Sequence, residues 1–370
     1  MTAALLLASA CTDRPRDGVD GPTGASTDSG PTDPTDPTGD PTGVDGGPVR
    51  IDGGGGDPGS ASAVTTCADG GPVYAVWVDD SPASSGAVWL NRFDADGWLD
   101  APVSVDPEPK IASAVEVQCE GDRVWLVWAS ARDAYGDSGI WYQQSDDAGD
   151  HWLDAPVPVD SDPDGASDGA YTSVAGRGDE RLVVWADDRS GVYDILAARS
   201  VDGGRHWQRP VRVDAGDGYS ARPKVAFGDG DLRFVAWEDS RNAAIDVYVA
   251  RSIDGGDTFL PDIAPSGTPG GPAEVEPVVC VDEAGAPTVA WSDAGRDGAS
   301  PDVWAGWSPD DGATWEPHRV DDRDDGQSLH PRCLSDGGGI HLAWDEGPGE
   351  ASIAHRRVVD GAPSGPSATV

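Results

Sequence analysis

The feature that most constrains this chain is a repeat. A short apolar run that ends in tryptophan occurs six times, at intervals of 51 to 57 residues. The tryptophans are Trp77, Trp128, Trp185, Trp237, Trp291 and Trp344. Units of this length that are rich in short apolar runs and turn residues are typical of the blades of a propeller rather than of a solenoid. The spacing predicts an all-β fold, a six-bladed β-propeller over residues 47–370.

A second repeat has the pattern Ser-x-Asp-x-Gly-x-x-aromatic and occurs four times. Its members are Ser145, Asp147, Gly149 and Trp152; Ser200, Asp202, Gly204 and Trp207; Ser252, Asp254, Gly256 and Phe259; and Ser308, Asp310, Gly312 and Trp315. An Asp side chain can accept backbone N–H bonds within its own turn, while Gly supplies the left-handed position. The aromatic residue then packs on the neighbouring hairpin. We predict that these residues are structural.

These four segments resemble the Asp-box, or bacterial neuraminidase repeat, of the sialidase superfamily. The stretch "WEDSRNAAIDVYVARSIDGGDTF", from Trp237, is similar to that repeat unit over its whole length. The resemblance implies a sialidase-like propeller whose Asp-box turns lie on the face opposite the active site. It implies little about activity, because Asp-boxes occur in many unrelated proteins.

The ring also has to close. Outer strands of the type "PVRVD" recur late in the units, and another copy, "PVRID", stands at Pro48 before the first unit begins. We therefore predict that residues 47–52 complete the sixth blade, so that an N-terminal strand closes the ring and leaves no open sheet edge. The alternative is that the C-terminal tail supplies this strand.

The N-terminus, "MTAALLLASAC", resembles a bacterial lipoprotein signal over residues 1–10, with Cys11 as the lipidated residue. A truncated ordinary signal peptide is the alternative. Residues 11–46 are rich in Asp, Pro, Thr and Gly and contain no aromatic side chain, which predicts a disordered tether. This layout predicts a monomer that a lipid anchors in the cell envelope, at the outer-membrane surface or outside the cell.

Removing Cys11 leaves four cysteines in an oxidising compartment, an even number. Adjacent inner strands approach each other at the axis of a propeller, so we predict the disulfides Cys67–Cys119 and Cys280–Cys333. A Cys67–Cys333 bridge across the closure is the alternative.

The charge excludes one class of partner. With 66 acidic and 25 basic residues, the formal net charge is −41, so nucleic-acid binding is not expected. We expect no cofactor. The segment "DSDPDG" does begin like a calcium loop, with Asp160, Asp162 and Asp164 as candidate ligands. Its twelfth position is Tyr171 rather than a bidentate Glu, so an acidic solvated turn is the preferred interpretation.

Function is expected at the other face, where the innermost strands begin. Aligning "ASAVE", "AYTSV", "ARPKV", "VEPVV" and "LHPRC" places Ser113, Tyr171, Arg222, Glu276 and His330 at one level around the channel mouth. Such a group of polar residues fits a site for a glycan or a protein ligand. A mouth that is polar only because it is wet is the alternative.

The loops after the second strands carry a further set of candidates. These are Arg132, Arg189, Arg241 and Arg296, each with Asp nearby. Ion pairs satisfied within the repeat are the preferred interpretation, and a carboxylate-binding cluster is the alternative.

The family comparison also bears on catalysis. Similar sialidases use an arginine triad, an aspartic acid–base and a Tyr nucleophile activated by Glu, so Tyr171, Glu276 and Arg222 are the catalytic candidates. The usual Arg-Ile-Pro is missing, and the last tyrosine is Tyr248, too early for the family's nucleophile. We therefore predict a binding protein first. A sialidase-type glycoside hydrolase and a scaffold protein are the alternatives.

Overall fold

The computed structural model describes part of the chain. Its described residues are 62–66, 71–79, 86–94, 97–98, 101–106, 112–131, 138–160, 170–295, 300–322, 326–335, 338–347, 352–359 and 361–369. These residues form β-strands and turns and contain no helix, as the all-β prediction requires. They accordingly contain no helix of the length and hydropathy needed to cross a bilayer. The predicted signal peptide, Cys11 and the tether lie outside the described residues.

The described strands form six antiparallel sheets. Sheet 1 contains β1 (Ser62–Thr66), β2 (Val73–Asp79), β3 (Ala87–Asp94), β4 (Gly97–Trp98) and β5 (Val103–Ser104). Sheet 2 contains β6 (Ala112–Glu120), β7 (Arg123–Ala131), β8 (Ser138–Ser145) and β9 (Val157–Pro158). Sheet 3 contains β10 (Ala170–Arg177), β11 (Glu180–Asp187), β12 (Asp194–Ser200) and β13 (Val211–Arg212).

The second half of the chain repeats this plan. Sheet 4 contains β14 (Ser220–Phe227), β15 (Arg233–Asp239) and β16 (Asp246–Ser252), with an isolated bridge between Val249 and Ile263 in place of a fourth strand. Sheet 5 contains β17 (Glu274–Val281), β18 (Pro287–Asp293), β19 (Asp302–Trp307) and β20 (Glu316–Arg319). Sheet 6 contains β21 (Ser328–Ser335), β22 (Ile340–Glu346), β23 (Ser352–Val359) and β24 (Ala362–Thr369).

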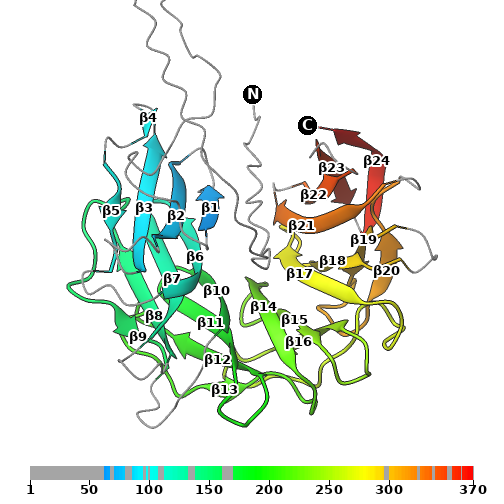
Figure 1. Cartoon of the computed structure of the whole chain (residues 1–370), viewed down its shortest axis with the longest axis horizontal. Helices are drawn as coiled ribbons and strands as arrows, with labels where there is room; N and C mark the ends of the chain where they lie inside the picture. The colour runs from blue at the N-terminus through cyan, green and yellow to red at the C-terminus, as the bar shows by residue number, and fades with distance from the viewer. Residues whose placement is uncertain are drawn as a thin grey trace, which may run out of the picture.

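The sheets follow one another around a common centre in chain order (Figure 1). The first strand of each sheet is the innermost, and it contacts the first strand of the next sheet from β1 through β6, β10, β14 and β17 to β21. Since strands within a sheet are antiparallel, the start of the first strand and the end of the second lie at one edge. We call this the upper edge. The turn after the third strand lies at the opposite, lower edge.

The repeat tryptophans explain why the sheets stack. Each lies in the second strand of its sheet, and Trp128, Trp185 and Trp237 are fully buried. Apolar clusters join neighbouring sheets; Trp125 of sheet 2, for example, shares one with Trp185 of sheet 3. Burying so large a side chain contributes on the order of 3–5 kcal/mol, so six tryptophans can support a chain whose apolar content is only 38%.

The four Ser-x-Asp turns have the geometry predicted for structural residues. In each turn, the glycine N–H donates to the serine Oγ, at 2.8 Å in Gly149, 2.9 Å in Gly204, 2.8 Å in Gly256 and 2.7 Å in Gly312. One Asp oxygen also accepts the N–H four residues later, as from Asp202 to His206 at 3.0 Å. The aromatic residue packs on the preceding sheet, as Trp207 does on Tyr142 with ring centroids 5.2 Å apart.

The prediction for the closing strand is wrong. The outer strand of sheet 6 is the C-terminal β24, which pairs with β23 from Val359 opposite Ala362 to Ala354 opposite Thr369. Gly361, whose φ is 76°, lets the chain reverse directly after β23, so the tail folds back on the strand that precedes it. Residues 47–52, which were expected in this place, lie outside the described residues.

One predicted disulfide is confirmed. Cys280 and Cys333 are bonded at an S–S distance of 1.98 Å and join the innermost strands of sheets 5 and 6. This excludes the alternative Cys67–Cys333 pairing. Cys119 is also disulfide-bonded, and its predicted partner, Cys67, lies outside the described residues.

Candidate functional site

The innermost strands share a backbone irregularity near the upper edge. In each of sheets 2 to 6 the pairing with the second strand shifts at a bulge. A residue at each bulge has a left-handed backbone, with φ of 48° at Ala114, 57° at Tyr171, 51° at Arg222, 58° at Glu276 and 55° at His330. Non-glycine residues in this region are strained by about 1–2 kcal/mol, and such strain gathers at functional sites.

Arg222 lies at the centre of the polar groups gathered at these bulges. Its Nη1 is 3.7 Å from Oε1 of Glu276 and 3.6 Å from Oε1 of Glu238. Its guanidinium carbon lies 5.4 Å from the ring centroid of Tyr171. One arginine therefore joins side chains from three neighbouring sheets.

His330 continues this set of contacts into sheet 6. Its Nε2 is 3.2 Å from Oε1 of Glu276, and its Nδ1 is 3.0 Å from Oδ2 of Asp345. Direct contacts therefore link the four side chains that the sequence alignment placed at one level, which are Tyr171, Arg222, Glu276 and His330. Together with Glu238 and Asp345 we call them the axial cluster.

Two members of this cluster were not predicted. Glu238 and Asp345 each follow a repeat tryptophan directly, at the end of a second strand. Glu238 accepts the backbone N–H of Glu276 at 2.7 Å, and Ser292, at the same position in the next sheet, accepts that of His330 at 3.1 Å. These side chains therefore support the strained backbone of the following sheet.

A signal for these residues exists in the sequence. The residue after the repeat tryptophan is Val78, Ala129 or Ala186 in the first three units and Glu238, Ser292 or Asp345 in the last three. The residue after the tryptophan thus changes from apolar to polar between the third and fourth units. This change would have indicated that sheets 4 to 6 contribute polar second-strand side chains to the site.

The environment shifts the pKa values of the two glutamates in opposite directions. Burial raises the pKa of Glu238, and the negative charge of Glu276 adds to this effect. Burial acts in the same sense on Glu276, but the hydrogen bond from His330 and the charges of His330 and Arg222 outweigh it and lower the pKa. The hydrogen bond to Glu276 raises the pKa of His330. The cluster thus holds fixed positive and negative groups side by side.

No protein-family model matches this chain, and no curated protein matches it. Solved structures do. A protein of unknown function from Dyadobacter fermentans aligns with 80% of this chain and 92% of its own, at 14% identity and a TM-score of 0.56. A polysaccharide lyase described as an ulvan lyase aligns with 83% of this chain and 82% of its own, at 13% identity and a TM-score of 0.54.

A third solved structure agrees with these two. An α-L-arabinanase from Penicillium chrysogenum aligns with 80% of this chain and 92% of its own, at 13% identity and a TM-score of 0.53. The fold is a β-propeller. Identities this low establish the fold and not the function.

Two of the four loop arginines, Arg189 and Arg241, lie among the described residues and form ion pairs within the repeat. Arg189 donates to Asp187 at 2.6 Å and to the fully buried Asp160 at 2.7 Å. Arg241 donates to Asp239 at 2.6 Å and to Asp262 at 3.0 Å. Both are held by carboxylates of the propeller itself, so neither has the open geometry of a ligand site. Arg132 and Arg296 lie outside the described residues.

The candidate in sheet 2 is displaced by one residue. Ser113 pairs with Ala129 before the bulge, and the left-handed residue is Ala114. In sheets 4 to 6 a proline follows the left-handed residue and marks the register, whereas Val115 stands there in sheet 2. Ala114 brings no polar group to the mouth.

A second polar layer lies two residues further along the innermost strands. Lys224 Nζ contacts Glu116 Oε2 at 2.7 Å, and Ser173 Oγ donates to Glu116 Oε1 at 2.9 Å. These side chains come from sheets 4, 2 and 3 and connect the innermost strands directly below the axial cluster.

The calcium interpretation gains no support. The Asp160 carboxylate is fully buried and paired with Arg189, while Asp162 and Asp164 lie outside the described residues. In the part of the chain that the structure covers, no group of three His, Cys, Asp or Glu residues could hold a metal ion.

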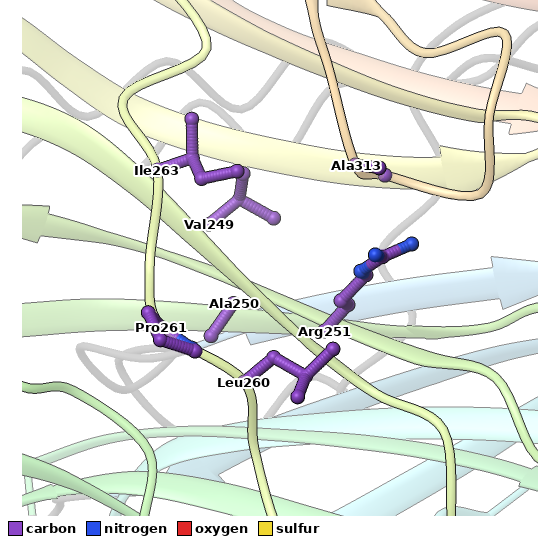
Figure 2. Close-up of a pocket in the computed structure, with 8 residues that line it drawn as sticks. Val249, Ala250, Arg251, Leu260, Pro261, Ile263 and Ala313 are labelled. Atoms are coloured by element: carbon purple, nitrogen blue, oxygen red, sulfur yellow. The ribbon is translucent and has the colours of Figure 1, made fainter.

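A small cavity of about 180 Å³ lies elsewhere, at the outer side of β16. Leu260, Pro261 and Ile263 line it on one side, and Ala313 of a Ser-x-Asp turn on another (Figure 2). Its lining is mainly apolar. Arg251, which also lines it, donates to the backbone oxygen of Asp311 at 2.7 Å. The cavity shares no lining residue with the axial cluster.

Proposed function

We propose that the six sheets are the blades of a closed six-bladed propeller and that its axial cluster binds a glycan. The observation that carries this proposal is the set of contacts from Tyr171 through Arg222 and Glu276 to His330. It places hydrogen-bond donors and acceptors alternately across four neighbouring blades. Sugars present closely spaced hydroxyl groups that both donate and accept, so they match such a row.

The geometry of Arg222 supports a ligand in particular. Among the described residues, its ion pairs are no shorter than 3.6 Å, and its side chain is 40% exposed. Arg241, by contrast, is held at 2.6 Å by a fully buried carboxylate. An arginine whose carboxylate partners lie beyond hydrogen-bond distance can direct donors to an incoming hydroxyl or carboxylate group.

Glycan-array binding by the whole protein, in detergent, tests this proposal. Arg222→Ala should weaken binding at least ten-fold. Arg205→Ala is the matched control, because Arg205 is an exposed arginine on a Ser-x-Asp turn at the lower edge, and it should leave binding unchanged. Equal binding by wild type and Arg222→Ala, or no binding by wild type, would contradict the proposal.

Hydrolysis is the second candidate, favoured by the two glutamates. Glu238, with a raised pKa, and Glu276, with a lowered pKa, both approach Nη1 of Arg222. Opposite shifts in neighbouring carboxyl groups are the arrangement that general acid–base catalysis requires. Sialidase chemistry is less well supported, because Tyr171 contacts Arg222, which stands between it and Glu276.

Fluorogenic sialosides and arabinosides distinguish the candidates. Turnover that Glu276→Gln lowers at least a hundred-fold, by more than the same variant weakens glycan binding, would favour the hydrolase. Glycan binding without turnover would favour the binding protein. If neither is observed, the scaffold alternative is favoured.

The location of the protein is also a proposal. A lipid anchor at Cys11 would hold a monomeric propeller at the cell envelope, with residues 11–46 as the tether. Mass spectrometry of the N-terminal peptide should find diacylglycerol on Cys11, and an unmodified Cys11 would contradict the anchor.

A further inference from the structure

An aromatic pair extends the axial cluster over the upper edge of sheets 3 and 4. Tyr219, three residues before Arg222, is 46% exposed, and its ring centroid lies 5.2 Å from that of Tyr193 in an edge-on arrangement. Val192, next to Tyr193, is also among the exposed large apolar residues. On a chain with a formal charge of −41, two exposed apolar side chains close to a cluster of charges are candidates for a contact with a ligand.

The backbone around Tyr219 is held firmly, although its ring is exposed. Its N–H donates to Ser240 Oγ at 3.0 Å, and its carbonyl accepts the Ser240 N–H at 3.0 Å. The next residue, Ser220, donates its N–H to the carbonyl of Tyr193 at 2.8 Å. Holding the ring in place in advance lowers the entropy cost of binding.

Tyr219 also belongs electrostatically to the axial cluster. Burial raises the pKa of its phenol, and the charges of Tyr171 and Glu238 raise it further, while that of Arg222 opposes them. The Tyr219 phenol therefore experiences the charges of the polar row, and along the chain it stands three residues before Arg222.

The neighbouring sheets have the same backbone contact without the aromatic pair. Glu274 donates its N–H to Ile245 at 2.8 Å between sheets 4 and 5, and Ser328 donates to Pro301 at 2.9 Å between sheets 5 and 6. The backbone contact needs no tyrosine at either position. Tyr193 packs on the apolar cluster of sheets 3 and 4, but this packing does not explain the exposed ring of Tyr219. Ile245, at the position of Tyr193, offers a matched control.

We propose that Tyr219, supported by Tyr193, is a stacking platform for the apolar face of a sugar ring, and that the site takes an oligosaccharide rather than a monosaccharide. This inference rests on the proposed glycan-binding function. One sugar ring lies on Tyr219, while the hydroxyl groups of the next ring bond to Arg222 and Glu276. An aromatic face supplies dispersion and apolar contact, and the charged row supplies direction.

The test uses the full-length protein and a panel of mono-, di- and tetrasaccharides from xylan, arabinan, galactan and polygalacturonate. Calorimetry should show that wild type binds the di- and tetrasaccharide of at least one series ten-fold or more tightly than the monosaccharide. Tyr219→Ala should remove this advantage and change monosaccharide binding less than two-fold. Tyr219→Phe, which keeps the ring, and the control Ile245→Ala should retain it.

The outcomes separate this inference from the function on which it rests. If Arg222→Ala abolishes binding while Tyr219→Ala keeps the full advantage of the longer sugars, the platform is wrong and the glycan site stands. Equal wild-type affinity for short and long sugars also overturns the platform. If wild type binds no saccharide of the panel or the glycan array, both fail. Near-ultraviolet circular dichroism of each variant shows whether it is folded.

Discussion

The Ser-x-Asp turns and the left-handed positions of the innermost strands are both repeated, but in different ways. In the turns, backbone and side chains recur together: Ser200 Oγ accepts the N–H of Gly204 at 2.9 Å, as its counterparts do elsewhere. At the left-handed positions only the backbone recurs. The side chain there is methyl in Ala114, phenol in Tyr171 and guanidinium in Arg222.

This difference separates stability from function. A side chain that bonds to its own turn is fixed by the fold, so each copy must keep it. At the left-handed positions the backbone recurs without requiring a particular side chain. A different functional group can therefore occupy this position in each blade. The turns should therefore tolerate substitution poorly and the axial cluster well, while ligand binding should depend on the cluster and the adjacent Tyr219 and not on the turns.

The largest effect is expected in a turn. In Gly204→Ala, the added Cβ would lie 2.1 Å from Cε1 of Tyr142, at a φ of 77°. Overpacking and backbone strain together should lower the free energy of unfolding by about 4 kcal/mol, measured by urea denaturation. Gly191→Ala is the control: its φ is 96°, but no atom lies within 4 Å of the added Cβ, so it should cost about 1 kcal/mol. Equal costs would contradict the packing argument.

A smaller loss of stability is expected where an arginine at the upper edge is fully paired. Arg241→Ala leaves the carboxylate of Asp239, which is fully buried, without its main partner. The free energy of unfolding should fall by about 3 kcal/mol, and glycan binding by the folded fraction should not change. Lost binding at unchanged stability would assign Arg241 to the site and weaken the contrast with Arg222.

At the left-handed positions of the innermost strands, a substitution to glycine should raise the free energy of unfolding rather than lower it. In Arg222→Gly the backbone keeps a φ of 51° without a Cβ, so the free energy of unfolding should rise by about 1 kcal/mol relative to Arg222→Ala. Both variants should lose glycan binding equally. A glycine variant that is less stable than the alanine variant would show that the backbone at Arg222 is not strained.

The sequence alone predicted the features in which side chains recur from unit to unit better than those in which only the backbone recurs. The tryptophan spacing predicted the sheets, and the Ser-x-Asp pattern predicted the turns, because both depend on local chemistry that repeats. The alignment of the innermost strands also predicted that four side chains lie at the same height, because strand register carries over between units. These are Tyr171, Arg222, Glu276 and His330. Glu238 and Asp345 were not predicted as members of the site. They lie on second strands, and their contacts with the innermost strands cross between strands or sheets.

The remaining errors have similar causes. Ser113 was misplaced by one residue, because a bulge changes the register and no proline marks it in sheet 2. The role of β24 could not be read from a repeat, since the C-terminal tail lacks the outer-strand pattern and pairs through a direct hairpin instead.

The smallest effect concerns a histidine in a turn. His151 Nδ1 lies 2.6 Å from Asp147 Oδ2, and this hydrogen bond raises the pKa of His151. The same bond, with the backbone N–H of His151 and the hydroxyl of Ser145, lowers the pKa of Asp147 to about 2. A raised histidine pKa stabilises the fold below pH 6.5, and a lowered aspartate pKa stabilises it above pH 3.8. The pair therefore contributes most between these values.

Titration by nuclear magnetic resonance measures the pKa of His151, and urea denaturation at several pH values measures the contribution to stability. In Asp147→Asn the pKa of His151 should fall towards 6.5, and the difference in urea midpoint from wild type should be greatest near pH 5 and shrink as the pH rises past the wild-type pKa of His151. His330 is the internal control, because Glu276, at the upper edge, raises its pKa and that value should not move. A shift of His330 in this variant would mean that the two edges are coupled, and the separation between turn and cluster would then fail.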